Sequence, residues 1–303
     1  MSTTDSDFVL FHYTPSKPAA ILFVVLFILT IAVYAVQTIH SVKKASKEYM
    51  SNPFEPIDAE KNVLEKKEDK PINIVSMVCV FIPFFVGGIM EVVGYIARVV
   101  SSSNSQELAP YIIQALLLLV APALMAATIY MIFGRLLQIL RCQSLMLVSA
   151  RFGTTFFVIG DVFSFFLQAA GGGLMSQQGS TKTGSTLVTI GLFIQIAFFG
   201  FFIVNEIRFT LNVKTRCQFY ESMSKKWVFV NGTLLLSSIL IMLRSIVRVI
   251  EFIQGFDGYI ISHECFIYIF DAVPMLFVII AFSVGSYFGN LFDIIVEFQI
   301  LTS

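Results

Sequence analysis

The chain has 303 residues, of which 56% are hydrophobic and only 13% are charged, and its mean hydropathy is +0.82. A soluble domain does not have this composition, which is that of an integral membrane protein. The 20 basic and 20 acidic residues balance, so no strong overall field favours nucleic acid or another polyanion as a partner. The length accommodates about six to eight spans and no separate soluble domain, so residues 1–303 form a single membrane domain.

Seven apolar runs are long enough to cross roughly 30 Å of hydrocarbon. The first is not a cleavable signal peptide, because its apolar stretch has about 22 residues and no basic residue lies in the segment 1–16 before it. We therefore predict an all-α integral membrane protein with seven transmembrane helices. Their approximate limits are Pro18–Ile39, Ile72–Ile96, Tyr111–Phe133, Phe152–Met175, Thr186–Asn205, Trp227–Ile250 and Phe266–Phe288.

Basic residues are divided very unequally between the two sides of the predicted bundle. The connectors on one side carry 15 Lys and Arg residues, and the segments on the other side carry 3. Because basic residues resist translocation, the richer side faces the cytoplasm. This places the N-terminus outside and the C-terminus in the cytoplasm.

The longest connector, residues 43–70, alternates Lys with Glu and Asp and contains Pro53 and Pro56. This pattern predicts a mobile, solvated cytoplasmic loop with no catalytic role.

The cysteines and histidines offer little chemistry. Cys142 and Cys217 fall in predicted cytoplasmic connectors and Cys79 falls within a span, so only Cys265 lies outside and no extracellular disulfide is expected within one chain. The three histidines are scattered, which predicts no metal site and argues against an intramembrane zinc hydrolase. We expect neither an enzyme nor a bound cofactor.

Charged and amide side chains interrupt the apolar runs at helical spacing. Each costs several kcal/mol in hydrocarbon, on the order of 2 to 3 kcal/mol for a charge on insertion scales. Separations of four and seven residues place the members of one span on a single stripe, which should face the bundle interior. The candidates are Glu91 and Arg98 in the second span, Gln114 in the third, Asp161 and Gln168 in the fourth, Arg244, Arg248 and Glu251 in the sixth, and Glu264 and Asp271 in the seventh.

These polar stripes should meet in a crevice that opens towards the outside. With the N-terminus outside and a rise of about 1.5 Å per residue, most of the candidates lie in the outer half and Asp161 lies near the middle. Two interpretations stay open: ion pairs that hold the bundle together, or a site for the charged head of an amphipathic ligand, since Arg grips carboxylate or phosphate in two places. Asp161 is also the candidate for a proton-linked carboxylate.

Short motifs that include these residues follow one another along nearly the whole chain, and in order and placement they resemble the fungal lipid-translocating exporter family. That family consists of seven-helix membrane proteins linked to resistance to amphipathic toxins. The motifs are Tyr13-Thr-Pro15-Ser16, Glu91-x-x-Gly94-Tyr95-x-x-Arg98, Tyr111-x-x-Gln114, Ala121-Pro122, Ala126-Ala127-x-x-Tyr130, Asp161-Val-x-Ser164-x-x-x-Gln168-x-x-Gly171, Arg244-x-x-x-Arg248-x-x-Glu251 and Glu264-x-x-x-Tyr268-x-x-Asp271-x-x-Pro274-Met275.

The resemblance implies transport of an amphipathic small molecule across the plasma membrane or between its leaflets. The first expectation is protoporphyrin uptake and haem efflux, the second is translocation of a sphingoid base or other membrane lipid, and the third is a seven-helix receptor or sensor for such a ligand. The two propionates of a porphyrin suit Arg244 and Arg248, which lie four residues apart, whereas a sphingoid amine suits Glu91, Asp161 or Asp271.

Overall fold

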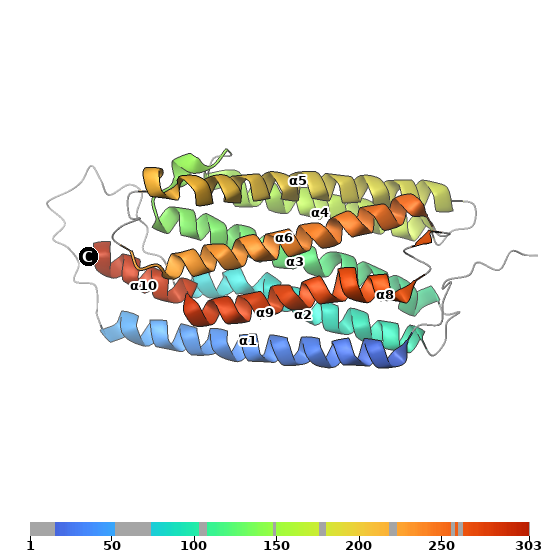
Figure 1. The fold of residues 1–303 in the computed structure, drawn as a ribbon, viewed down its shortest axis with the longest axis horizontal. Coiled ribbons are helices and arrows are strands. Elements are labelled where there is room, and N and C mark those ends of the chain that lie inside the picture. The colour runs from blue at the N-terminus through green and yellow to red at the C-terminus, as the bar shows by residue number, and fades with distance from the viewer. Residues whose placement is uncertain are drawn as a thin grey trace, which may run out of the picture.

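The computed structural model describes residues 16–51, 74–102, 108–147, 150–175, 180–217, 223–255, 258–259 and 263–302. Within these ranges the chain is helical, without strands, and seven helical segments are long and apolar enough to cross a membrane (Figure 1). The predicted seven-helix fold is therefore confirmed. The first six spans are α1 (Lys17–Ser51), α2 (Ile74–Ser101), α3 (Leu108–Ile139), α4 (Ala150–Met175), α5 (Thr181–Arg216) and α6 (Lys226–Gln254).

The seventh span is built from several helical pieces. It begins with α8 (Glu264–Ile267), continues through a π-helical turn, η2 (Tyr268–Ala272), and runs on as α9 (Val273–Phe288). Pro274 has no amide hydrogen to donate to the carbonyl of Phe270, and the wider π turn lies directly before it. A short 3-10 turn, η1 (Gln143–Leu145), follows α3.

The helix α1 extends beyond the predicted first span and ends only at Ser51. Residues 43–51 of the predicted solvated loop are therefore helical. The rest of that prediction, residues 52–70, lies outside the described residues.

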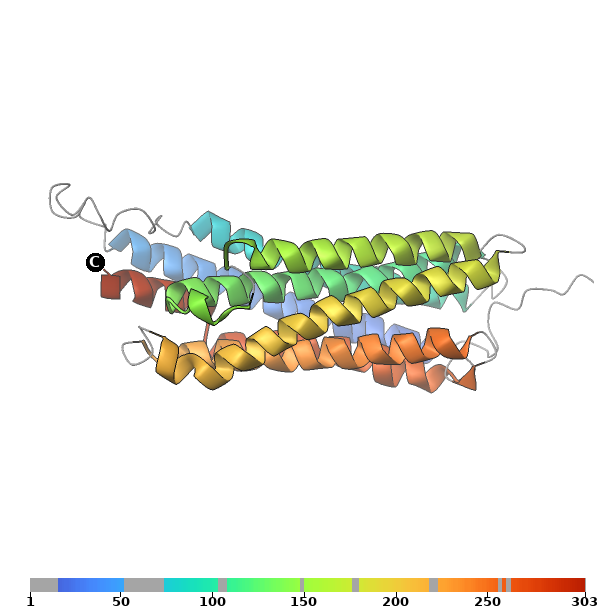
Figure 2. The ribbon, with the colours of Figure 1, turned by 90° about the horizontal axis from the view of Figure 1, so that it is seen from above.

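The spans pack chiefly as the pairs α2 with α3, α4 with α5, α1 with α2, and α6 with α9. Figure 2 shows α5 crossing the bundle obliquely, so that it lies beside α4 at one end and beside α6 at the other. Close packing at the first end depends on glycine, because a Cβ atom added at Gly171 of α4 would lie 2.6 Å from the backbone oxygen of Gly184 of α5. At the other end, Asn231 Nδ2 of α6 donates to Thr210 Oγ1 of α5 at 2.9 Å.

The outward faces of the spans carry large apolar side chains, such as Leu22, Val36, Phe166 and Leu211, which are all more than half exposed. In a soluble protein such surfaces would be costly, but hydrocarbon accepts them. The interior is aromatic, and Tyr130 packs edge-on against Phe202 with ring centroids 4.5 Å apart.

After residue 288, where the sequence predicted no element, the helix α10 (Leu291–Thr302) runs on past α9 at the end of the bundle where α1 also ends, and it contacts α1, α3 and α6 (Figure 1). Its Phe292 and Ile294 are buried, and its Asp293 forms ion pairs with Lys44 of α1 at 3.3 Å and Lys226 of α6 at 3.7 Å. The end of the chain is thus attached to the first and sixth spans.

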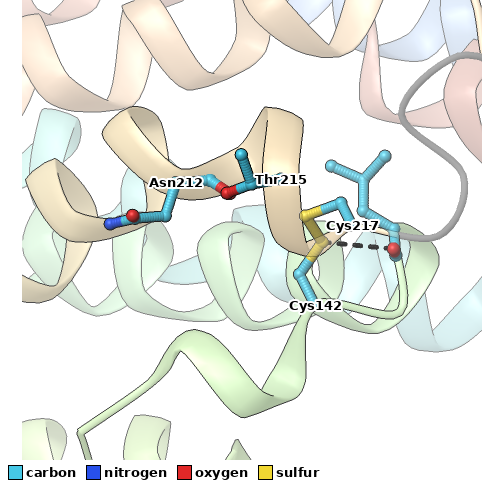
Figure 3. Close-up of a disulfide and its surroundings, with 5 residues drawn as sticks. Cys142, Asn212, Thr215 and Cys217 are labelled. Atoms are coloured by element: carbon cyan, nitrogen blue, oxygen red, sulfur yellow. Dashed lines mark hydrogen bonds between the residues drawn. A yellow bond between two sulfur atoms is a disulfide. The ribbon is translucent and has the colours of Figure 1, made fainter.

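A disulfide joins Cys142, just after α3, to Cys217 at the end of α5, with Cα atoms 5.0 Å apart (Figure 3). Cys142 is fully buried, and its Sγ lies 3.2 Å from the carbonyl oxygen of Leu140. The sequence analysis anticipated no bond here, because it placed both cysteines on the cytoplasmic side.

Candidate functional site

The centre of the candidate site is Asp271, on the π turn of the seventh span. Its Oδ1 lies 2.5 Å from Nε of Arg244, and its Oδ2 lies 3.4 Å from Nη2 of Arg248. Asp271 is 4% exposed and Arg244 is 3% exposed, so the charges are held out of solvent. Arg244 also donates through Nη2 to the carbonyl oxygen of Leu118 in α3. One carboxylate therefore holds two guanidinium groups inside the membrane domain.

Arg244 and Arg248 reach the same carboxylate because they are one turn apart on α6. Arg248 has a second acidic partner on its own helix, since its Nη1 lies 3.2 Å from Glu251. The predicted stripe on the sixth span thus exists and faces the seventh span.

A second ion pair lies beside the first. Arg98 Nη2 of α2 is 2.9 Å from Glu264 Oε1 of α8, and its Nε donates to the Tyr268 hydroxyl at 3.1 Å. The same carboxylate accepts the backbone N–H of Ser16 at 2.8 Å, which ties the segment before α1 to this cluster. Tyr95 donates to Asp271 at 3.4 Å, and its ring stacks on that of Tyr268 with centroids 6.4 Å apart, so it lies between the two ion pairs.

Aromatic rings flank the connected ion pairs. Phe23 of α1 stacks on Tyr268 with ring centroids 5.2 Å apart and on Tyr95 at 5.9 Å. We call the group formed by Arg98, Arg244, Arg248, Glu251, Glu264 and Asp271, with the three rings, the arginine network.

Two further candidates form no ion pair or hydrogen bond with the arginine network in the described part of the chain. Glu91 of α2 is fully buried and interacts electrostatically with Arg244, Asp271 and Arg248. Gln114 of α3 is 6% exposed, and its amide oxygen accepts no hydrogen bond among the residues that the structure describes.

The two candidates on α4 form contacts elsewhere. Asp161 accepts a hydrogen bond from the Tyr130 hydroxyl at 2.8 Å, and Gln168 Nε2 donates to Ser164 at 2.8 Å and to Gln195 of α5 at 3.0 Å. Among the described residues, neither Asp161 nor Gln168 forms a hydrogen bond or ion pair with the arginine network. The polar stripes of α2, α6 and the seventh span therefore meet, as predicted. The polar stripe of α4 does not join them, and its side chains contact α3 and α5 instead.

One buried acidic residue was missed. Glu206 of α5 is fully buried, but the predicted fifth span stopped at Asn205, which put Glu206 in a connector. The helix continues to Arg216. The helical spacing of Phe202, Phe209 and Val213, which are buried on the same face as Glu206, was the signal that could have revealed it.

The three arginines of the network, each paired with a carboxylate, are groups that can bind an anion. Arginine binds carboxylates in a bidentate manner, and an apolar, aromatic surrounding strengthens such contacts. Among the described residues, no group of three or more His, Cys, Asp and Glu side chains could hold a metal ion.

The fold and the buried charges define a multi-pass membrane protein with an ion network inside a seven-helix bundle. Residues 84–294 match the family model described as RTA1-like protein, and the chain belongs to this family. No solved structure matches the chain.

Named relatives come from baker's yeast. Protoporphyrin uptake protein 1 of Saccharomyces cerevisiae is 70% identical over the full length of both chains. Protein RTM1 of the same species is 58% identical over 99% of this chain and 98% of its own. Sphingoid long-chain base transporter RSB1 is 27% identical over 64% of this chain and 60% of its own. The relatives are named as transporters or membrane proteins, in agreement with a non-enzymatic role.

Proposed function

We propose that this protein transports an amphipathic small molecule across the plasma membrane, and that the molecule is a protoporphyrin or haem. The observation that carries the proposal is the 70% identity, over the full length, to a protein named for protoporphyrin uptake. Buried arginines suit such a ligand, because a porphyrin has two propionates at one edge of a planar apolar ring.

The arginine network is the proposed binding site. Arg244 and Arg248 already hold one carboxylate, that of Asp271, at 2.5 and 3.4 Å. A ligand propionate would take the place of Asp271 on one guanidinium, so the exchange replaces one carboxylate by another and leaves no buried charge unpaired. The Phe23, Tyr95 and Tyr268 rings supply a surface against which a flat apolar ligand can stack.

A sphingoid base is the second candidate, and the 27% identity to a sphingoid long-chain base transporter supports it. Such an amine needs a carboxylate, and Glu91 offers one that is fully buried and has no ion pair among the described residues. A receptor or sensor for the same ligands would bind them without moving them.

The proposed orientation keeps the N-terminus outside and the C-terminus in the cytoplasm, because of the 15 to 3 distribution of basic residues. The arginine network then lies in the outer half of the bundle. It is placed to receive ligand from the outside or from the outer leaflet.

The test uses purified protein in liposomes, with protoporphyrin and a labelled sphingoid base followed separately. Arg248→Gln is the main variant, because it leaves the Arg244–Asp271 pair in place, and Arg244→Ala is the more severe one. Lys182→Gln, which removes an exposed positive charge from the start of α5, is the matched control.

We expect protein-dependent protoporphyrin movement that falls about tenfold or more in Arg248→Gln and is unchanged in Lys182→Gln, since a lost charge-assisted contact of about 1.5 to 3 kcal/mol corresponds to at least that factor. Movement of the sphingoid base alone would select the second candidate. Binding without movement of either ligand would select the sensor.

A further inference from the structure

The fifth span contains a buried carboxyl group, that of Glu206, which is not part of the arginine network. Glu206 is 0% exposed, and among the residues that the structure describes it forms no ion pair. The other buried acids of the membrane domain differ. Asp271 contacts two arginines, Glu91 lies near the same two, and Asp161 accepts a hydrogen bond from Tyr130.

The surroundings of Glu206 are polar but uncharged. Ser238 of α6 faces its carboxyl group and is itself fully buried. One turn along α5 from Glu206, Thr210 donates to the Glu206 backbone oxygen at 2.9 Å and accepts from Asn231 of α6 at 2.9 Å. The Oδ1 atom of Asn231 accepts no hydrogen bond in the described part of the chain.

These groups lead towards one end of the bundle. Glu206 lies ten residues before the end of α5 at Arg216, and Asn231 lies five residues after the start of α6 at Lys226. At about 1.5 Å per residue, Glu206 is roughly 15 Å from the end of α5, and Asn231 is roughly 8 Å from the start of α6. Thr210 and Asn231 thus occupy the interval between the surface and Glu206, on the side that we propose is cytoplasmic.

Other ionisable groups of the packed elements are engaged elsewhere or exposed. On α4, the described ionisable group is Asp161, which contacts Tyr130. On α6, Lys226 contacts Asp293, and Arg244, Arg248 and Glu251 belong to the arginine network. Those on α5 are Lys182, Arg208 and Lys214, which are exposed. The turn η1, also packed against α5, carries none. The helix α3 packs on Phe202 and Phe209 of α5 and carries Tyr130, which donates to Asp161, and Arg135, which donates to Gln138.

An isolated carboxylate cannot stay charged in hydrocarbon without a cation, since its transfer there costs several kcal/mol. A proton is the cation that fits, because the described side chain that faces the Glu206 carboxyl group is the Ser238 hydroxyl, and no described group of acidic, His or Cys side chains could hold a metal ion. We propose that Glu206 is a proton-binding site on the cytoplasmic half of the bundle and that its protonation couples ligand movement to the proton gradient. This inference rests on the proposed transport function, but its site is separate from the arginine network.

The mechanical link is the oblique course of α5. That helix packs on α4 at one end and meets α6 near Glu206 at the other (Figure 2). The sixth span carries Arg244 and Arg248. A change in charge at Glu206 alters the α5–α6 contact, and α6 transmits the change to the ligand site.

The experiment measures protoporphyrin accumulation in liposomes that contain the full chain, under a pH step of about one unit and with the membrane potential clamped. One proton per ligand predicts about tenfold accumulation for the intact protein. Glu206→Gln keeps the shape and removes the titration, so its accumulation ratio should fall to one while downhill movement continues. Asp293→Asn, the same change on α10, should accumulate ligand like the intact protein.

A second measurement does not depend on transport. The infrared spectrum of the reconstituted protein should show a protonated carboxyl band that Glu206→Gln removes and Asp293→Asn leaves in place. The proton site is overturned if Glu206→Gln leaves the protonated carboxyl band unchanged. It is also overturned if Glu206→Gln accumulates protoporphyrin as fully as the intact protein. Absence of any protein-dependent protoporphyrin movement, with the band present, would instead overturn the proposed transport function and leave the proton site supported.

Discussion

Replacing Asp271 by Asn tests how strongly the arginine network holds the bundle together. The substitution keeps the size of the side chain but removes the negative charge that lies 2.5 Å from Arg244 and 3.4 Å from Arg248. At an effective dielectric constant of about 20, these two attractions are each worth roughly 5 to 7 kcal/mol before desolvation is subtracted. Removing one partner of a buried ion pair costs about 3 to 5 kcal/mol net, and we expect a loss of that size.

The matched control is Glu251→Gln, which removes an acidic partner of Arg248 that lies three residues away on the same helix. Arg248 keeps Asp271 in this variant, and both side chains of the lost pair are partly exposed, so we expect a cost below about 1 kcal/mol. A third variant combines Asp271→Asn with Arg244→Met. It should lose less than Asp271→Asn alone, because it removes the Arg244 charge that Asp271→Asn leaves without an ion-pair partner, whereas Arg248 keeps Glu251.

Stability is measured by titrating protein in mixed micelles with a denaturing detergent and following the helical circular dichroism signal. Fluorescence of Trp227, the one tryptophan in the chain, gives a second probe near the start of α6. If Asp271→Asn costs no more than Glu251→Gln, the two arginines do not depend on Asp271 and the proposed exchange of carboxylates at this site loses its basis.

Two other predictions concern the contacts of α4 and α5. Gly171→Ala should cost about 1 to 3 kcal/mol, because its Cβ would meet the Gly184 backbone oxygen at 2.6 Å, whereas Gly172→Ala, with nothing within 4 Å, should change stability by less than about 0.5 kcal/mol. Equal effects would show that α4 and α5 do not pack so closely. Alkylation of the denatured protein should label Cys142 and Cys217 only after reduction; labelling of both beforehand would show that the bond is not formed in the membrane.

The sequence was sufficient for the number and placement of the spans, because each apolar run is long and a connector with charges separates it from the next. It was less informative about helix ends. A helix that continues past the hydrocarbon stays helical through internal hydrogen bonds, so α1 runs through lysines to Ser51 and α5 runs past Glu206 to Arg216. Hydropathy indicates where a span leaves the hydrocarbon of the membrane, but it does not indicate where the helix ends.

The arginine network was predictable for a related reason. Charges such as Arg244 and Asp271 are too costly to face lipid, so helical spacing alone puts them inside, where opposite charges find each other. Which carboxylate pairs with which arginine was not predictable, because it depends on how α2, α6 and the seventh span are rotated against one another. The π turn that carries Asp271 changes that rotation locally, and only Pro274 hinted at it.

The disulfide and the basic residues favour opposite orientations, because disulfides persist in oxidising compartments and basic connectors stay in the cytoplasm. The order of events decides between them. Orientation is set during insertion, when the connectors do or do not cross the membrane, whereas Cys142 and Cys217 come within 5.0 Å only after α3 and α5 have packed. In the orientation that we propose from the distribution of basic residues, the bond lies on the cytoplasmic side. Full burial of Cys142 then becomes essential, because a sulfur that soluble thiols cannot reach is protected from exchange.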